Sequence, residues 1–309
     1  AVTATVTSTI DISGNPTAVG GDPDVGIASV VDTFNIDGGD LTLSASQADG
    51  ETIVGNGSVT VTGLEDATDL SGIDTSDILV TATVTGATDI SSNSTAGGIQ
   101  NVVDTFVVEG DLTLTATQAD GETITGSGVV IITDLDSETD LSNVSTDLTV
   151  TATVTSTIDI SGNLTDGGIE TVVDTFELQD AGDLTLTATQ ADGETIIGEG
   201  TVTITGLGDG TDLGNIEDTE ALNVTATIAA SSVVVIADNP SMAAVDTYVM
   251  EAPLPAAPMT ELTLSASQAD SASKPVTITG EGALTITNLQ SDTNLSNVGL
   301  GASDLYVKA

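Results

Sequence analysis

The stretch LTLTATQADGETI, Leu112–Ile124, returns almost unchanged at Leu184–Ile196. A close relative, LTLSASQADGETI, lies at Leu41–Ile53, and a shorter one, LTLSASQAD, lies at Leu262–Asp270. In each copy aliphatic residues alternate with Thr or Ser, which is the period of a half-buried β-strand. The QADGE segment that follows is rich in turn-forming residues. The phrase therefore predicts a strand and a turn that recur along the chain.

The repeat has a coarse period of about 72 residues and a finer one of about 36. The coarse period is marked by the Asp of VVDTF or AVDTY, at Asp32, Asp104, Asp174 and Asp246. The finer period follows from LTVTATVTSTIDISG, which begins at Leu148 and aligns without gaps on the phrase at Leu112. We divide the chain into repeats 1–77, 78–147 and 148–220 and a divergent fourth repeat, 221–309, which we interpret as a cap or a junction.

A unit of about 36 residues with three short strands cannot close its own core, so neighbouring units must stack on it. We therefore predict an all-β fold, a β-solenoid of about eight coils of about 36 residues each. The alternative is four tandem Ig-like β-sandwich repeats of about 72 residues. In the solenoid we expect the aromatic residues at matching positions to form one column: Phe34, Phe106, Phe176 and Tyr248.

The composition excludes several functions. The chain of 309 residues has 47 Asp and Glu, two Lys, no Arg, His or Cys, and a net charge of −45. Such a chain cannot neutralise a phosphate backbone, so nucleic acid is excluded as a partner. No apolar run approaches the roughly 18 residues that a membrane span needs, so no membrane insertion is expected. Without His or Cys the usual nucleophilic machinery is absent, and we predict no catalytic residue and no enzyme.

Calcium is the one cofactor that the acids suggest. In DLDSETD four of them occupy alternate positions: Asp134, Asp136, Glu138 and Asp140. Hard oxygen ligands at this density suit Ca²⁺, and crowded carboxylates repel unless a cation neutralises them. A solvated acidic loop is the alternative for this segment. The acids of the QADGET loops are likewise interpreted as solvated.

The strands also present Thr at every second residue, as in TVTATVTST, which begins at Thr149. Ice-binding solenoids use such Thr-x-Thr rows, and this gives a remote alternative function. Outward-facing Thr is, however, ordinary for a solvated strand.

The two ends of the sequence match the same strand. DLYVKA at 304–309 matches DLTVTA at 147–152, and AVTATV at 1–6 matches TVTATV at 149–154. Either a longer repeat protein was cut at this point, or the end of one subunit continues the sheet of the next, which would give a head-to-tail homopolymer.

The phrases LTLTATQADGETI and GTVTITGL resemble repeats of very large acidic exported proteins of Gram-negative bacteria and cyanobacteria, of the surface-layer, adhesin or matrix type. The resemblance implies an extracellular or cell-surface location and a structural role in a fibre, sheath or surface layer, assembled through end-to-end β-strand contacts. The alternative is a Ca²⁺-stiffened spacer or binding segment of a large adhesin, whose partner would be a cell-surface glycan or protein.

Overall fold

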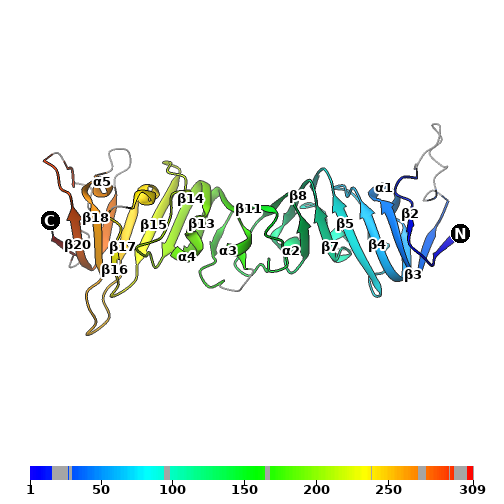
Figure 1. Ribbon diagram of the computed structural model, residues 1–309, viewed down its shortest axis with the longest axis horizontal. Coiled ribbons are helices and arrows are strands. Elements are labelled where there is room, and N and C mark those ends of the chain that lie inside the picture. Colours follow the sequence, from blue (N-terminus) through cyan, green and yellow to red (C-terminus); the bar gives the residue numbers. More distant parts are fainter. Residues whose placement is uncertain are drawn as a thin grey trace. The chain divides into compact units, whose positions relative to one another are not determined.

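The computed structural model describes residues 1–15, 27, 30–93, 98–163, 168–237, 239–270, 276–291, 293–295 and 305–308. β-Strands that pair in parallel sheets are the main regular structure of the described residues, and turns and very short helices join them (Figure 1). The chain divides into two compact units. Unit 1 comprises Ala1–Thr133, Thr139–Thr151 and Asp166–Val172, and unit 2 comprises Asp134–Glu138, Ala152–Thr165 and Val173–Ala309. Strand β11 (Thr149–Val154) contributes residues to both units.

Unit 1 contains one sheet in the order β1-β3-β4-β5-β7-β9, with β2 paired to β3, and a second run in the order β10-β8-β6. Its strands are β1 (Thr3–Val6), β2 (Ile10–Asp11), β3 (Thr33–Ser44), β4 (Thr52–Thr62), β5 (Ile78–Val84), β6 (Ala87–Asp89), β7 (Thr105–Val108), β8 (Asp111–Thr115), β9 (Thr123–Gly126) and β10 (Val129–Thr133). Its helices are α1 (Ala45–Ala48), α2 (Ala116–Ala119), α3 (Ile169–Val172) and the 3-10 turn η1 (Ile99–Asn101).

Unit 2 contains the run β19-β17-β15-β14-β13, with β12 paired to β13, and the separate sheet β16-β18-β20-β21. Its strands are β12 (Thr157–Asp159), β13 (Thr175–Thr187), β14 (Thr195–Thr205), β15 (Leu222–Ile228), β16 (Val233–Val235), β17 (Thr247–Met250), β18 (Glu261–Ser265), β19 (Thr277–Gly280), β20 (Gly282–Thr287) and β21 (Leu305–Lys308). Its helices are α4 (Ala188–Ala191), α5 (Ala266–Ala269) and the 3-10 turn η2 (Pro240–Ala244).

The parallel pairing confirms an all-β, solenoid-like fold. Every strand pair whose register the described residues define runs parallel. Ig-like sandwiches are built from antiparallel strands, so the alternative of tandem sandwiches finds no support.

The length of the coil differs from the sequence-based expectation. Thr105 pairs with Thr123, 18 positions further on, and Thr247 pairs with Thr277, 30 positions further on. The other registers defined by the described residues have steps between these two values, except that Ile10 pairs with Leu41, 31 positions further on. The prediction of about eight coils of about 36 residues is therefore not confirmed. The physical reason is visible at α1, which returns the chain directly alongside β3 as β4.

The core consists of aliphatic side chains stacked in register from strand to strand. Leu41 pairs with Val59, and Val59 with Val80, and all three are at most 1% exposed. Because the side-chain period of a strand is 2, one face of each strand is buried and the alternate residues, mostly Thr, face outward. Burial of this kind contributes roughly 1.5–3 kcal/mol for each large aliphatic side chain.

The prediction of a single aromatic column is wrong. The prediction placed an aromatic ring at every second coil of one column. Phe106 lies between Ala82 and Ile124, and its column continues through Ala82 and Val61 to Leu43, whereas Phe34 lies in a different column, beside Ile53. Tyr248 likewise lies between Ala226 and Ile278. A parallel stack must keep a constant spacing of about 4.8 Å between strands, and a small residue beside each ring makes room for it. This explains why Ala occupies the centre of the TAT sequence.

Two glycines form the bend in the middle of the long strand β14. Gly198 and Gly200 have φ values of 107° and 146°, which side chains rarely adopt. A Cβ at Gly198 would overlap the carbonyl oxygen of Leu178, and one at Gly200 would overlap that of Gly182. The backbones of adjacent strands approach too closely at this bend for any other residue.

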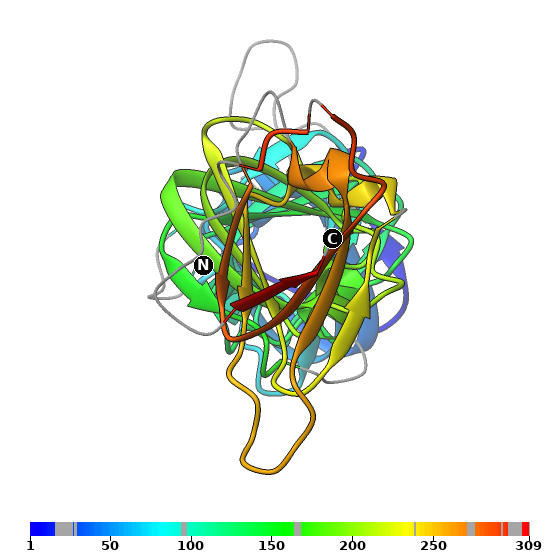
Figure 2. The same cartoon turned by 90° about the vertical axis from the view of Figure 1, so that its left-hand side faces the viewer.

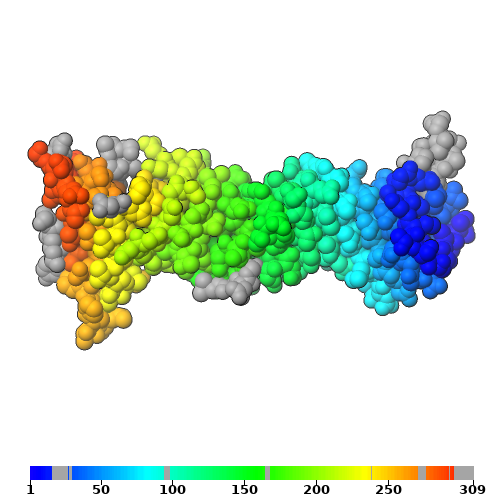
Figure 3. All heavy atoms as spheres, in the orientation of Figure 1, coloured from blue at the N-terminus to red at the C-terminus, as the bar shows by residue number. Residues whose placement is uncertain are grey.

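The Pro-rich segment of the fourth repeat is a projection rather than part of a sheet. Residues 251–260, between β17 and β18, extend from the strand ends opposite α5 (Figure 2). The segment stands out from the surface of its unit (Figure 3). No helix in the described part of the chain is long and apolar enough to cross a membrane.

Candidate functional site

The QAD segment forms a short helical turn, where the sequence predicted only an irregular turn. In α4 the hydroxyl of Thr187 accepts a hydrogen bond from the backbone N–H of Gln190 at 3.2 Å. The side-chain oxygen of Gln190 accepts one from the backbone N–H of Thr187 at 2.8 Å. This reciprocal pair is a capping box, which satisfies two backbone donors at the start of the helix. The recurring Thr or Ser and Gln of the phrase are the two members of this box.

The amide nitrogen of the same Gln binds a stretch of chain about 30 residues earlier. Gln190 Nε2 donates to the carbonyl oxygens of Ile160 and Asn163, at 2.7 and 2.9 Å. The equivalent bonds join Gln47 to Ile12 and Asn15, Gln118 to Ile90 and Asn93, and Gln268 to Ile236 and Asn239. The Gln190 side chain is 2% exposed. The repeated phrase thus includes a buried polar link that attaches each turn to the preceding coil.

Many acids of the repeat also bind backbone N–H groups. Asp104 accepts a hydrogen bond from the N–H of Val80 at 2.7 Å, and its own N–H donates to the carbonyl oxygen of Val80 at 2.9 Å. Asp246 makes the same pair of bonds with Val224. The Asp of the VVDTF motif therefore has a structural role, because it caps the strand of the preceding coil.

A second kind of acid forms pairs of carboxyl groups on adjacent strands. Thr105 pairs with Thr123, so the preceding residues, Asp104 and Glu122, start neighbouring strands in register. Burial, and then the charge of Asp104, raises the pKa of Glu122 to about 7.

The same pair recurs in the first and third repeats. Burial, and then the charge of Asp174, raises the pKa of Glu194 to about 7. Burial followed by the charge of Asp32 also raises the pKa of Glu51. The interpretation of the QADGET acids as solvated is wrong for these glutamates, which are partly buried. A carboxyl with a pKa near 7 can exchange a proton near neutral pH.

Asp11 and Asp159, two of the acids in the DIS motif, have the opposite property, a lowered pKa. The Asp159 carboxylate accepts from the Ser161 hydroxyl at 2.6 Å and from the Ser161 N–H at 2.9 Å. These two hydrogen bonds hold the pKa of Asp159 below its usual value. Asp11, Asp89 and Asp159 form the same turn with the Ser two residues later.

The four predicted calcium ligands are engaged in separate hydrogen bonds. Asp134 accepts from the Thr155 hydroxyl at 2.8 Å, and Asp136 accepts from the N–H of Glu138 at 2.7 Å. The Asp140 carboxylate accepts from the N–H of Ser142 at 2.9 Å, whereas the bond between Glu138 and Asp136 involves the backbone N–H of Glu138 and not its carboxylate. Among the described residues, no group of three or more acidic side chains is arranged to hold a metal ion. The structure gives the calcium site no support, and it stays a prediction.

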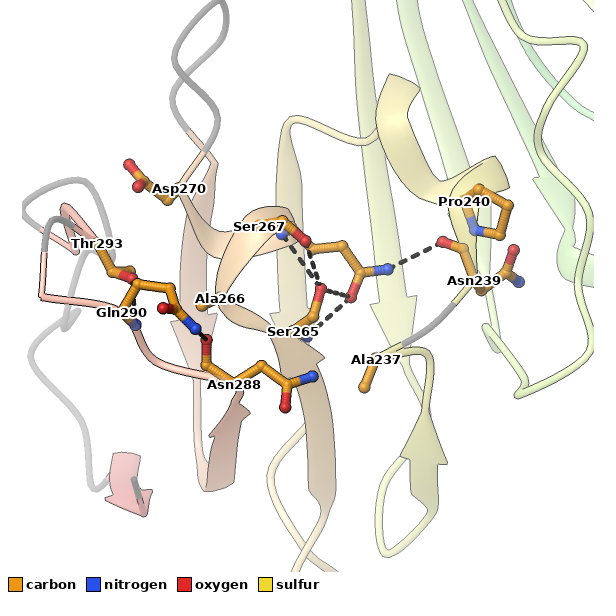
Figure 4. Close-up of a pocket in the computed structure, with 11 residues that line it drawn as sticks. Ala237, Asn239, Pro240, Ser265, Ala266, Ser267, Asp270, Asn288, Gln290 and Thr293 are labelled. Carbon is orange, nitrogen blue, oxygen red and sulfur yellow. Dashed lines mark hydrogen bonds between the residues drawn. The ribbon is translucent and has the colours of Figure 1, made fainter.

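Unit 2 has an open groove of about 660 Å³ beside α5 (Figure 4). Its polar side chains are partly committed to the fold: Gln268 donates to the Asn239 carbonyl at 2.9 Å, and Gln290 to the Asn288 carbonyl at 3.2 Å. A smaller groove of about 190 Å³ occupies the corresponding place beside α4, where Gly206 and Gly208 stand in place of Asn288 and Gln290. The groove therefore recurs at this position of the repeat, and in the fourth repeat it is larger and lined by different residues.

Comparison with models of protein families, with curated proteins and with solved structures finds no match for this chain. The interpretation of its function therefore depends on its own residues.

Proposed function

We propose that the chain is an extracellular structural protein, a subunit or segment of a fibre, sheath or surface layer, in which strands of neighbouring copies pair end to end. The proposal is supported most directly by the edge strand β1. β1 has the sequence TATV, and residues 81–84 of β5 have the same sequence. β5 pairs with β4 on one side and with β7 on the other, whereas within the described residues β1 pairs only with β3.

The free edge of β1 can be assigned to particular backbone groups. Thr33 donates its N–H to the carbonyl oxygen of Val2. In a parallel ladder alternate residues bind the same neighbour, so Thr3 and Thr5 direct their N–H and C=O groups to the other side. By analogy with β5, the strand that fits there has the SVTVT pattern of β4. A strand edge of this kind can take up another strand, from a neighbouring copy or from an adjoining repeat of the same protein.

We further infer that each unit is a β-solenoid. The pairing steps favour coils of 18 to 31 residues, so that the 36-residue sequence period spans more than one coil. Because β1 and β5 share the sequence TATV, a strand of another copy that resembles β4 would continue the stack in the register that β4 and β5 have.

The charge of the chain supports an assembly that depends on salt. A net charge of −45 keeps separate copies soluble and apart. Added salt shortens the range of this repulsion to about 10 Å at 0.1 M, so strand edges can approach. Assembly is therefore expected to increase with ionic strength.

The test is electron microscopy of the purified chain at low and high salt, with Ca²⁺ and with chelator. Thr5→Pro removes the donor on the free edge and leaves the bonds between β1 and β3 in place. Thr5→Val keeps that donor and serves as the matched control. Filaments of the native chain and of Thr5→Val, lost in Thr5→Pro, would support the proposal. Monodisperse particles under all conditions would contradict it and favour the spacer of an adhesin.

A further inference from the structure

Outward-facing Thr side chains form an ordered array on unit 1. The parallel registers place one residue of each column directly beside the next, from β3 through β4, β5 and β7 to β9. The first column is Thr42, Thr60, Thr81, Thr105 and Thr123, and the second is Ser44, Thr62, Thr83, Val107 and Thr125.

Unit 2 repeats this array on β13, β14, β15, β17 and β19. Its first column is Thr185, Thr203, Thr225, Thr247 and Thr277, and its second is Thr187, Thr205, Thr227, Val249 and Thr279. The two arrays even share the position of their single Val. The same arrangement is thus built twice from separate parts of the sequence.

The spacing within each array is regular in two directions. Neighbouring strands are about 4.8 Å apart, and alternate residues along a strand are about 6.6 Å apart. Residues below the array are fully buried, such as Leu43, Val61 and Ala82, so the strands rest on a close-packed core. β-Branched side chains have few rotamers, which holds the hydroxyl and methyl groups in fixed rows.

The arrays are free of charge in a strongly acidic protein. None of their positions is Asp, Glu or Lys, although the chain has 47 acids. Within the described part of the chain, the first-column hydroxyls make no hydrogen bond to the protein. Most second-column hydroxyls do: Thr62, Thr125 and Thr205 donate to backbone carbonyls at 3.3 Å, Thr83, Thr187 and Thr227 accept from backbone N–H groups, and Ser44 bonds to Ser46. In each array the first column is therefore a row of free hydroxyls that faces the solvent, beside the methyl groups of both columns.

We propose that each array is a binding surface for ice. The hydroxyl groups would hydrogen-bond to water at lattice-like intervals, and the methyl groups between them would restrict the orientation of the same water layer. A periodic, uncharged surface that repeats in two directions suits a crystalline partner, because each extra row adds the same contact. An anionic protein surface or a folded protein of irregular outline would not use this regularity.

The experiment measures the thermal hysteresis and the inhibition of ice recrystallisation of the full chain. The double variant Thr81→Lys and Thr225→Lys places one long charged side chain at the centre of each array. Leu79→Lys and Asn223→Lys is the matched control, because both residues lie on the same strands, are exposed, and stand two positions before the Thr columns. Both variants change the net charge equally.

The native chain and the control variant are expected to be active. The Thr variant should lose at least about tenfold in activity, because residues at the centre of an interface carry most of its binding energy. Circular dichroism tests whether the native chain and both variants are folded. If the Thr→Lys double variant is not folded, the single variants Thr81→Ser and Thr225→Ser are used in its place. An inactive native chain, or equal activity of the Thr and control variants, would overturn the proposal. Binding of the native chain to crystalline cellulose, or dimerisation lost in the Thr variant, without ice activity would also overturn it.

Discussion

The third and fourth repeats share a backbone plan but differ in their ionisable and loop residues. Both carry the turn with the linking Gln, which is buried at Gln190 and partly buried at Gln268, and the paired glycines of the strand bend. Where the third repeat has Glu194 beside Asp174, the fourth has Val276 at the corresponding position before a paired Thr. The residues that the two repeats share serve backbone geometry, whereas those that differ carry charge.

The loop that contains Gly206 in the third repeat and Asn288 in the fourth also keeps its backbone conformation while the side chain differs. Gly206 has a φ of 69°, and Asn288 in the fourth repeat has a φ of 59°. Asn is the residue other than Gly that adopts this left-handed conformation at least cost. The conformation is retained while the side chain, and with it the groove, changes.

The largest effect is expected at the strand bend, which the two repeats share. Gly198→Ala places a Cβ against the Leu178 carbonyl oxygen at a positive φ, and should destabilise the chain by about 3 kcal/mol or more. Gly280→Ala, against the Met250 carbonyl oxygen, should cost a similar amount. Urea unfolding measures both. Gly210→Ala, where an added Cβ meets nothing, is the control, and equal stability of all three variants would contradict the close approach.

The buried Gln should give the next largest effect. Gln190→Leu removes two donors and leaves the Ile160 and Asn163 carbonyl oxygens without this partner, which costs about 2–3 kcal/mol. Gln268→Leu should cost the same, since its bonds are equivalent. Gln179→Leu, at an exposed Gln, is the control in thermal unfolding. A tolerated Gln190→Leu would mean that the link between coils is not needed for stability.

The smallest effect is expected in the pH dependence of stability, to which Glu122 and Glu194 contribute and to which the fourth repeat, with Val276 at the corresponding position, does not. A carboxyl whose pKa rises from 4.5 to about 7 on folding stabilises the chain fully below about pH 4.5, and this contribution is lost as the pH rises through about 7. Because Glu122 and Glu194 are half-exposed, we expect about 1 kcal/mol from each. The lowered pKa of Asp159 acts oppositely, as its contribution is lost when the pH falls below its ordinary value of 3.8. Stability should be greatest at about pH 5.

Urea midpoints between pH 4.5 and 8.5 test this dependence. Glu122→Gln with Glu194→Gln should flatten the fall in stability above pH 5, because Gln is neutral at all these values. Glu109→Gln with Glu199→Gln removes the same charge at exposed positions and should keep the native profile. Val276→Glu should add the dependence to the fourth repeat. A native profile in the Glu122 and Glu194 variant would show that the pairs do not bind the proton.

The sequence predicted the strands and their buried face, because a period of 2 with aliphatic residues on one side has few other interpretations. It did not predict the coil length. The strand that follows β3 can pair with it after a turn of any length that brings the chain back alongside β3 in register. Nor did it predict the role of Gln190, which looked like a polar turn residue. Its signal was present in the pattern Thr-x-x-Gln, which is that of a capping box.

The sequence by itself determined that the chain is a repeating β-protein with an aliphatic core, an acidic surface and no His, Cys or Arg, because these follow from local periodicity and composition. Only the tertiary structure decided which residues become neighbours. Strand registers placed Glu122 beside Asp104, brought Ala82 against Phe106, and aligned Thr residues from five strands into columns. Such contacts join positions that are 18 to 30 residues apart, and no local pattern specifies that distance.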